Sequence, residues 1–143
     1  LVRKGEVTLT MRLIEGEFPN YRQVLPKVVS RKVTMPSDTL SQALRRVALL
    51  SVERSTAVRV ELSSSRLRLS ATNPDLGEAS EEIDIDYQGE ALTVGFNARY
   101  LLDSLAAFKT KEVELGLEDE LSPARLSPMD DPETVAVVMP MRL

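Results

Sequence analysis

Residues 32–50 read KVTMPSDTLSQALRRVALL and predict a short strand followed at once by a helix. Lys32–Met35 is the predicted strand, and Pro36 precedes a helix-start signal in which Ser37 or Asp38 is the cap. We expect the helix to run to about Leu50. Its apolar side chains recur at helical spacing and form one stripe for a core: Leu40, Ala43, Leu44 and Val47.

Leu49 does not fit the amphipathic pattern of this helix. It falls about 180° from Leu40, on the side that carries Arg45 and Arg46. A leucine on the polar side is out of place in a simple amphipathic helix, so another role is expected for it.

The same order of elements occurs twice along the chain. Three strands are predicted after the first helix, at 57–62, 66–71 and 79–87. A strand at 91–96, Asn97 as a cap and a helix over 98–108 then restart the pattern, with three strands near 112–117, 124–127 and 134–139. The sequence therefore predicts an α+β fold of two pseudo-duplicated strand-helix-three-strand units. Their two helices would pack side by side on one face of a continuous antiparallel sheet.

The residues before this repeat have a different pattern. Glu6–Ile14 alternates between apolar and polar side chains, which predicts a half-buried strand. Residues 18–27 contain two prolines and an asparagine and predict a connector, which is apolar enough that it should pack against something. Leu1 is not an initiator methionine, and the first residues have the pattern of the middle of a strand.

Composition excludes several chemistries. The 143 residues include no Cys, His or Trp, so a thiol nucleophile, a Ser-His-Asp triad and a zinc site of the usual ligands are ruled out. No apolar run approaches the roughly 20 residues of a membrane span, and no signal peptide opens the sequence, so the cytosol is the expected location.

Charge is unevenly distributed along the chain. The net charge is −4, but residues 1–68 carry +7 and residues 69–143 carry −11. The alternating carboxylates Glu82, Asp84 and Asp86 could bind a hard cation, although a solvated strand face is the favoured interpretation. A basic patch could contact DNA phosphates, but a pI near 5.0 and few aromatic residues permit only weak, sequence-independent contact. That patch would consist of Lys27, Arg31, Lys32, Arg45 and Arg46.

The C-terminal run AVVMPMRL, residues 136–143, is apolar on both faces. Pro140 cannot donate a hydrogen bond and indicates a sheet edge. One interpretation is a terminal edge strand that packs into the core. The other is an exposed groove wall whose methionines suit varied peptide partners.

Three segments together closely resemble the bacterial sliding clamp, the β subunit of DNA polymerase III. They are FPNYRQVLPK at 18–27, FNARYLLDSLAAF at 96–108 and VVMPMRL at 137–143, and ATNPDLGEASEEI at 71–83 also fits the last domain of that family. The resemblance covers essentially the whole chain. It implies a DNA replication processivity factor, which is a polymerase accessory protein with no catalytic residues, metal or cofactor of its own.

The resemblance also implies an architecture. Clamp protomers have three similarly folded domains, and two protomers form a dimeric ring around duplex DNA. Residues 1–25 would be the end of the middle domain with its connector, and residues 26–143 the complete third domain. The DNA-facing candidates on the two helices are Arg45, Arg46, Arg99 and Lys109. Leu49 and Leu50 would face the neighbouring protomer, which would account for the misplaced leucine.

The family's cleft for short linear peptides lies between its middle and third domains and receives polymerase, the clamp loader and repair proteins. Its walls here would be Pro19, Val24, Asn97, Tyr100, Leu121, Pro123, Val137, Val138, Met139, Pro140, Met141, Arg142 and Leu143. Gln23 and Ser55 depart from some family members and would alter peptide preference at the rim. The alternative function is a stand-alone peptide-binding clamp fragment that does not encircle DNA.

Overall fold

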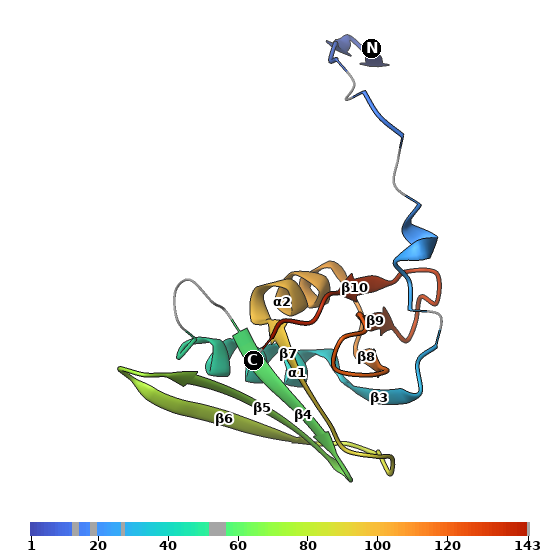
Figure 1. The fold of residues 1–143 in the computed structure, drawn as a ribbon. Coiled ribbons are helices and arrows are strands. Elements are labelled where there is room, and N and C mark those ends of the chain that lie inside the picture. The colour runs from blue at the N-terminus through green and yellow to red at the C-terminus, as the bar shows by residue number, and fades with distance from the viewer. Residues whose placement is uncertain (13–14, 18–19, 27, 52–56, 143) are drawn as a thin grey trace.

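Two helices, α1 (Ser37–Ala48) and α2 (Ala98–Ala107), contact each other and pack against two antiparallel sheets (Figure 1). The computed structural model describes residues 1–12, 15–17, 20–26, 28–51 and 57–142. Each helix follows directly from a strand, β3 (Arg31–Pro36) before α1 and β7 (Leu92–Asn97) before α2. The α+β class and the pair of helices are confirmed.

The two units exchange their leading strands. The first sheet has the order β6-β5-β4-β7, and the second has the order β10-β9-β8-β3. Each sheet therefore contains three consecutive strands of one unit and the leading strand of the other. The strands of the first sheet are β4 (Ala57–Ser63), β5 (Arg66–Asn73) and β6 (Gly77–Asp84) beside β7. Those of the second are β8 (Glu112–Leu117), β9 (Ala124–Pro128) and β10 (Ala136–Val138) beside β3.

The sheet is divided into two, whereas we expected it to be continuous. Among the described residues, a single isolated bridge between Gly95 and Met141 joins the edge of the first sheet to the segment that follows β10. The division follows from the pairing of β3 with β8 and of β7 with β4, which the order of elements along the sequence does not determine.

The core lies between the helices and the sheets. Leu44 and Val47 of the predicted apolar stripe are fully buried, as are Val58 and Phe96 of the first sheet. Burial alternates along β3, where Val33 and Met35 point inward and their neighbours are exposed. Helix periodicity and strand alternation therefore meet in one apolar core.

The expected caps differ between the two helices. Asn97 caps α2 as predicted, since its Oδ1 accepts a hydrogen bond from the Arg99 N–H at 2.9 Å. The predicted cap at Ser37 or Asp38 is wrong, because β3 continues to Pro36 and Ser37 is already the first residue of α1. The Ser37 N–H instead donates to the Lys111 carbonyl at 2.9 Å, so the packed strand replaces a side-chain cap.

The N-terminal segment extends away from the α+β domain (Figure 1). β1 (Val2–Lys4) pairs with β2 (Val7–Leu9) through a turn in which Gly5 has a φ of +59°. The predicted half-buried strand over residues 6–14 is wrong for its described part, because β2 has only three residues and its apolar side chains are exposed. Residues 13–14 lie outside the described part of the chain. Alternation buries one face only where an apolar surface lies against it, and none among the described residues lies against this hairpin.

The connector is irregular apart from one turn of 3-10 helix, η1 (Tyr21–Gln23). Leu25 and Pro26 are half-buried, and they share a cavity of about 1000 Å³ with Arg125 and Met129 of the second sheet and its following loop. The expectation that this apolar connector packs against the domain is therefore met by Leu25 and Pro26, whereas Tyr21 and Val24 are exposed and Lys27 lies outside the described residues.

Candidate functional site

The C-terminal run leaves the second sheet and reaches the edge of the first. Val138 is buried in β10, whereas the side chain of Met139 is 57% exposed. Two residues later, the Met141 N–H donates to the Gly95 carbonyl of β7 at 2.7 Å. The run therefore divides into a first part that packs into the core, as one interpretation expected, and a second part that stays accessible.

A cavity of about 470 Å³ lies beside this run. One wall is the run itself, another is the edge of β7, and the third is the loop between β8 and β9. The lining residues are Thr93, Val94, Gly95, Glu120, Leu121, Met139, Pro140, Met141 and Arg142. Leucine, methionine and proline side chains dominate this lining, so the cavity offers apolar surface with one carboxylate and one guanidinium beside it.

Asp119 shapes the loop that carries Leu121. Its Oδ1 accepts hydrogen bonds from the Leu121 N–H at 2.8 Å and the Ser122 N–H at 2.6 Å, and its Oδ2 accepts from the Ser122 hydroxyl at 2.9 Å. These donors, the Leu121 N–H foremost, lower the pKa of Asp119 because they stabilise the carboxylate. The turn holds Leu121 in a position where the residue is 78% exposed, so its apolar side chain faces solvent beside the cavity.

The structure brings five of the predicted cleft residues together around this cavity: Leu121, Met139, Pro140, Met141 and Arg142. Val137 and Val138 lie in β10 and do not line it, nor does the half-buried Pro123. Asn97 is occupied as the cap of α2, and Tyr100 is exposed on that helix.

Other predicted positions lie elsewhere or outside the described residues. Val24 is exposed on the connector and does not line the cavity. Pro19 and Leu143 lie outside the described part of the chain. The same is true of Ser55, one of the two residues that depart from some family members. The structure therefore does not test whether Pro19 and Val24 form part of the predicted cleft, and their role stays a prediction.

Sequence reasoning missed Thr93, Val94, Gly95 and Glu120 as lining residues. The first three belong to β7, whose edge becomes a wall only because Met141 pairs with it. Glu120 lies in a run of three acidic residues that is typical of a solvated turn. No local signal in the sequence brings these residues to the C-terminal run.

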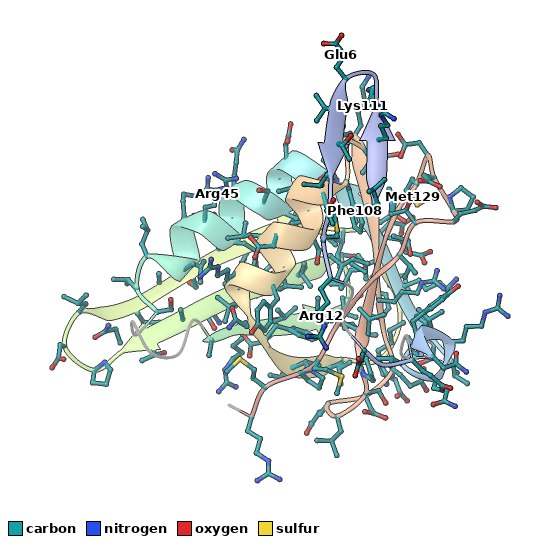
Figure 2. All side chains as sticks on the ribbon, turned by 90° about the horizontal axis from the view of Figure 1, so that it is seen from above. Glu6, Arg12, Arg45, Phe108, Lys111 and Met129 are labelled. Carbon is teal, nitrogen blue, oxygen red and sulfur yellow. The ribbon has the colours of Figure 1, made fainter. Side chains whose placement is uncertain are left out.

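The basic candidates on the two helices have unequal surroundings. Arg45 is exposed on the outer side of α1 (Figure 2). Arg46 instead donates to Glu81 of β6 through Nε at 2.7 Å and Nη2 at 3.1 Å. This pairing raises the pKa of Arg46 and lowers that of Glu81, so both groups stay charged. On α2, Arg99 approaches Asp103 at 3.8 Å, and Lys109 is exposed just beyond the helix.

The C-terminal end of α1 presents apolar surface. Leu49 is 79% exposed and Leu50 is half-buried, as the helical pattern predicted for Leu49. Leu76, in the turn between β5 and β6, is 68% exposed. Exposed apolar side chains indicate a contact surface only where they form a continuous patch.

The acidic strand is part of a network of ion pairs. Glu82 pairs with Arg66 at 3.1 Å, and Arg68 lies within 3.8 Å of Glu61 and 3.7 Å of Glu78. The described residues contain no group of three or more acidic side chains that could hold a metal ion. The arginine partners balance the charge of Glu61, Glu78 and Glu82 on this sheet. No helix in the described part is long and apolar enough to cross a membrane.

The chain is similar to known proteins over nearly its whole length. The family model described as "DNA polymerase III beta subunit, C-terminal domain" matches residues 22–142. The Beta sliding clamp of Proteus mirabilis is 42% identical over 139 residues, which cover 97% of this chain and 38% of that protein. The Beta sliding clamp of Escherichia coli K12 is 39% identical over 139 residues, which again cover 97% of this chain and 38% of that protein.

Solved structures agree with this similarity. A DnaN sliding clamp from Pseudomonas aeruginosa bound to griselimycin has a TM-score of 0.89 and 39% identity, and the match covers 92% of this chain and 36% of that one. A clamp from Bartonella birtlesii, also bound to griselimycin, has a TM-score of 0.85 and 34% identity over 91% of this chain and 35% of its own. The chain thus spans about 38% of the length of the curated relatives that it matches.

Proposed function

The chain belongs to the family defined by the C-terminal domain of the DNA polymerase III beta subunit, and from this premise we propose that it serves as part of a sliding clamp in DNA replication. In this proposal the protein acts as a processivity factor and not as an enzyme. It encircles duplex DNA as a homodimeric ring in the cytoplasm and tethers polymerase, the clamp loader and repair proteins through one peptide-binding cleft. The match over residues 22–142 is the observation that carries this proposal.

In this proposal the cavity beside the C-terminal run is the part of the cleft that receives peptide side chains. Its lining supports that role, because Leu121 and Met139 leave apolar surface open to solvent beside the paired segment of Met141 and Gly95. Apolar anchors of an extended peptide would gain free energy by covering that surface, and flexible methionines adapt to different anchors. Val24, Tyr100 and the remaining predicted residues would extend the walls.

The helices would face the central hole of the ring. Arg45 is exposed on α1 and is the strongest candidate for contact with phosphate, followed by Lys109. Few exposed cations on an acidic chain give weak, sequence-independent attraction, which suits a ring that must slide along DNA. The protein would be retained on DNA by its closed topology and not by tight binding.

Leu49 and Leu50 would lie in the interface between protomers, where burial accounts for leucines that the core does not use. Residues 1–25 would be the end of the preceding clamp domain. The exposed apolar side chains of β2 support that assignment, because a strand with an alternating pattern is stable when a larger sheet covers one face.

Substitution of the two most exposed apolar residues of the cavity tests the cleft. We expect Leu121→Ala combined with Met139→Ala to weaken binding of a polymerase-derived peptide at least tenfold, measured by fluorescence anisotropy. Leu76→Ala combined with Met129→Ala is the matched control, since both residues are similarly exposed and neither lines the cavity. Unchanged affinity in the first variant would refute the assignment of the cleft.

A further inference from the structure

The loop between β8 and β9 carries three consecutive acidic residues, Glu118, Asp119 and Glu120, and each of them has different contacts. This loop separates the 470 Å³ cavity from a smaller one of about 350 Å³, and Glu120 and Leu121 line both. A loop that forms a wall can also set which peptides the cleft accepts. What each carboxylate contacts decides which of them is available to a peptide.

Glu118 is used to anchor the loop. Its Oε2 accepts a hydrogen bond from the Ser30 N–H at 2.7 Å, and its carbonyl accepts one from the Arg31 guanidinium. Arg31 also donates to the Glu90 carboxylate at 3.1 Å, and its side chain is 19% exposed. The loop is thereby tied to the start of β3 and to the segment before β7.

Asp119 is used within the loop. Its two oxygens accept three hydrogen bonds from Leu121 and Ser122, all of 2.9 Å or less. A carboxylate with this many donors is already well satisfied, and it holds the backbone of the next two residues in place. The position of Glu120 between Asp119 and Leu121 is consequently fixed from both sides.

Glu120 differs from both neighbours. It is exposed, it lines the cavity, and it has no hydrogen bond or ion pair with any residue that the structure describes. It supplies the cavity's one carboxylate among the described lining residues, and Arg142 supplies the one guanidinium. The wall therefore presents an exposed negative charge beside apolar surface, and a positive charge lies on the C-terminal run.

Because Glu120 is exposed beside the apolar lining of the cavity, we propose that it makes the cleft prefer peptides that carry a lysine or arginine next to their apolar anchors. The proposal rests on the proposed function of the cleft as a peptide site and adds a charge preference to it. The apolar lining gives affinity, and the free carboxylate discriminates among peptides by pairing with a basic side chain or repelling an acidic one. An exposed ion pair of this kind changes affinity by about two- to fivefold at low salt.

The test uses peptides with one shared leucine- and phenylalanine-containing segment and with Lys, Gln or Glu at each flanking position in turn. At one of these positions we expect the Lys peptide to bind the wild-type chain about two- to fivefold more tightly than the Glu peptide at low salt. The preference should shrink at about 0.5 M salt. Glu120→Gln should abolish it, and Glu120→Lys should reverse it. Asp130→Lys, in the loop before β10 and away from this cavity, should leave it unchanged.

The outcomes separate this inference from the proposed function. If Lys, Gln and Glu peptides bind equally well at every position, and Glu120→Lys changes nothing, the charge preference is refuted while the cleft stands. If no peptide binds, or if binding is insensitive to Leu121→Ala, the cleft itself is refuted and the preference with it. A preference that persists in Glu120→Gln would also overturn the role of Glu120.

Discussion

At the scale of single residues, Arg31 joins three separate stretches of the chain beside the loop that carries Leu121. Its guanidinium contacts the Glu118 carbonyl and the Glu90 carboxylate, and its own backbone begins β3. Nothing in the sequence distinguishes this arginine from the other basic residues of the first half. Its position next to the loop of Leu121 depends on the pairing of β3 with β8, in which Arg31 faces Leu117.

We expect Arg31→Met to weaken peptide binding several-fold by loosening the loop, in addition to lowering stability by about 1 kcal/mol. Arg125→Met is the matched control, since Arg125 pairs with Glu114 at 2.8 Å on the same sheet, whereas Arg31 donates to the Glu118 carbonyl of the loop that carries Leu121. Chemical unfolding and peptide titration would measure both quantities. Equal effects of the two substitutions on peptide affinity would mean that Arg31 has only a general structural role.

The lowered pKa of Asp119 predicts how the stability of the chain changes with pH. Its pKa in the folded chain is below the ordinary value of about 3.9, so its contribution to stability is complete above that value. The contribution is lost as the pH falls through the folded pKa. Wild type should therefore be more stable than Asp119→Asn at about pH 6, and the difference in Tm should vanish as the pH approaches about 2.

Asp131 provides the comparison for that titration. Thr134 lowers its pKa through a similar turn in a loop that does not line the cleft cavity. Asp131→Asn should change the acid limb of the stability curve in the same way but leave peptide binding at about pH 6 unchanged. A Tm difference for Asp119→Asn that grows toward acid would contradict the assigned pKa direction.

At the scale of elements, α1 separates its two leucine surfaces clearly. Leu44→Ala removes a fully buried side chain and should destabilise the chain by about 3 kcal/mol. Leu49→Lys should change unfolding free energy by less than about 0.5 kcal/mol, because Leu49 is 79% exposed.

Leu49 and the half-buried Leu50 also allow a test of the proposed interface between protomers. Sedimentation of Leu49→Lys with Leu50→Lys, in the protein as its gene encodes it, should show monomers. A stable dimer would refute the interface.

The basic residues of α1 lead to a second prediction at this scale. Arg45→Gln should reduce the salt dependence of duplex binding by about one unit of slope, because one phosphate contact is lost. Arg46→Gln should have a smaller effect, since Glu81 already neutralises Arg46 in a two-point ion pair. Glu81→Gln would then increase DNA affinity by releasing Arg46. If Glu81→Gln weakens DNA binding, this view of the helix is wrong.

Local signals predicted most of the elements, and their failures have physical causes. The helix stripe, the short strand before that helix and the cap at Asn97 all depend on neighbours in sequence, and they are confirmed. The cap at Ser37 failed because a packed carbonyl from Lys111 supplies the hydrogen bond. The long N-terminal strand failed because alternation alone does not provide a surface to pack against.

At the scale of the whole molecule, the sequence predicted the duplicated units but not how they combine. The exchange of β3 and β7 between sheets depends on contacts far apart in the chain, which have no local signature. The same is true of the cavity, since its walls come from β7, the loop before β9 and the C-terminal run. Of the predicted C-terminal wall, residues 139–142 line the cavity, whereas Glu120 and the edge of β7 could be found only in three dimensions.

The most direct test of the proposed clamp is its retention on DNA of different topology. The protein as its gene encodes it would be loaded by the clamp loader onto nicked circular DNA, which would then be cut once. We predict that protein stays on the circle through a high-salt wash and is released when the circle is linearised, because it can slide off the ends. Equal retention on circular and linear DNA would contradict encirclement, and peptide binding without any topological retention would favour a stand-alone peptide-binding protein.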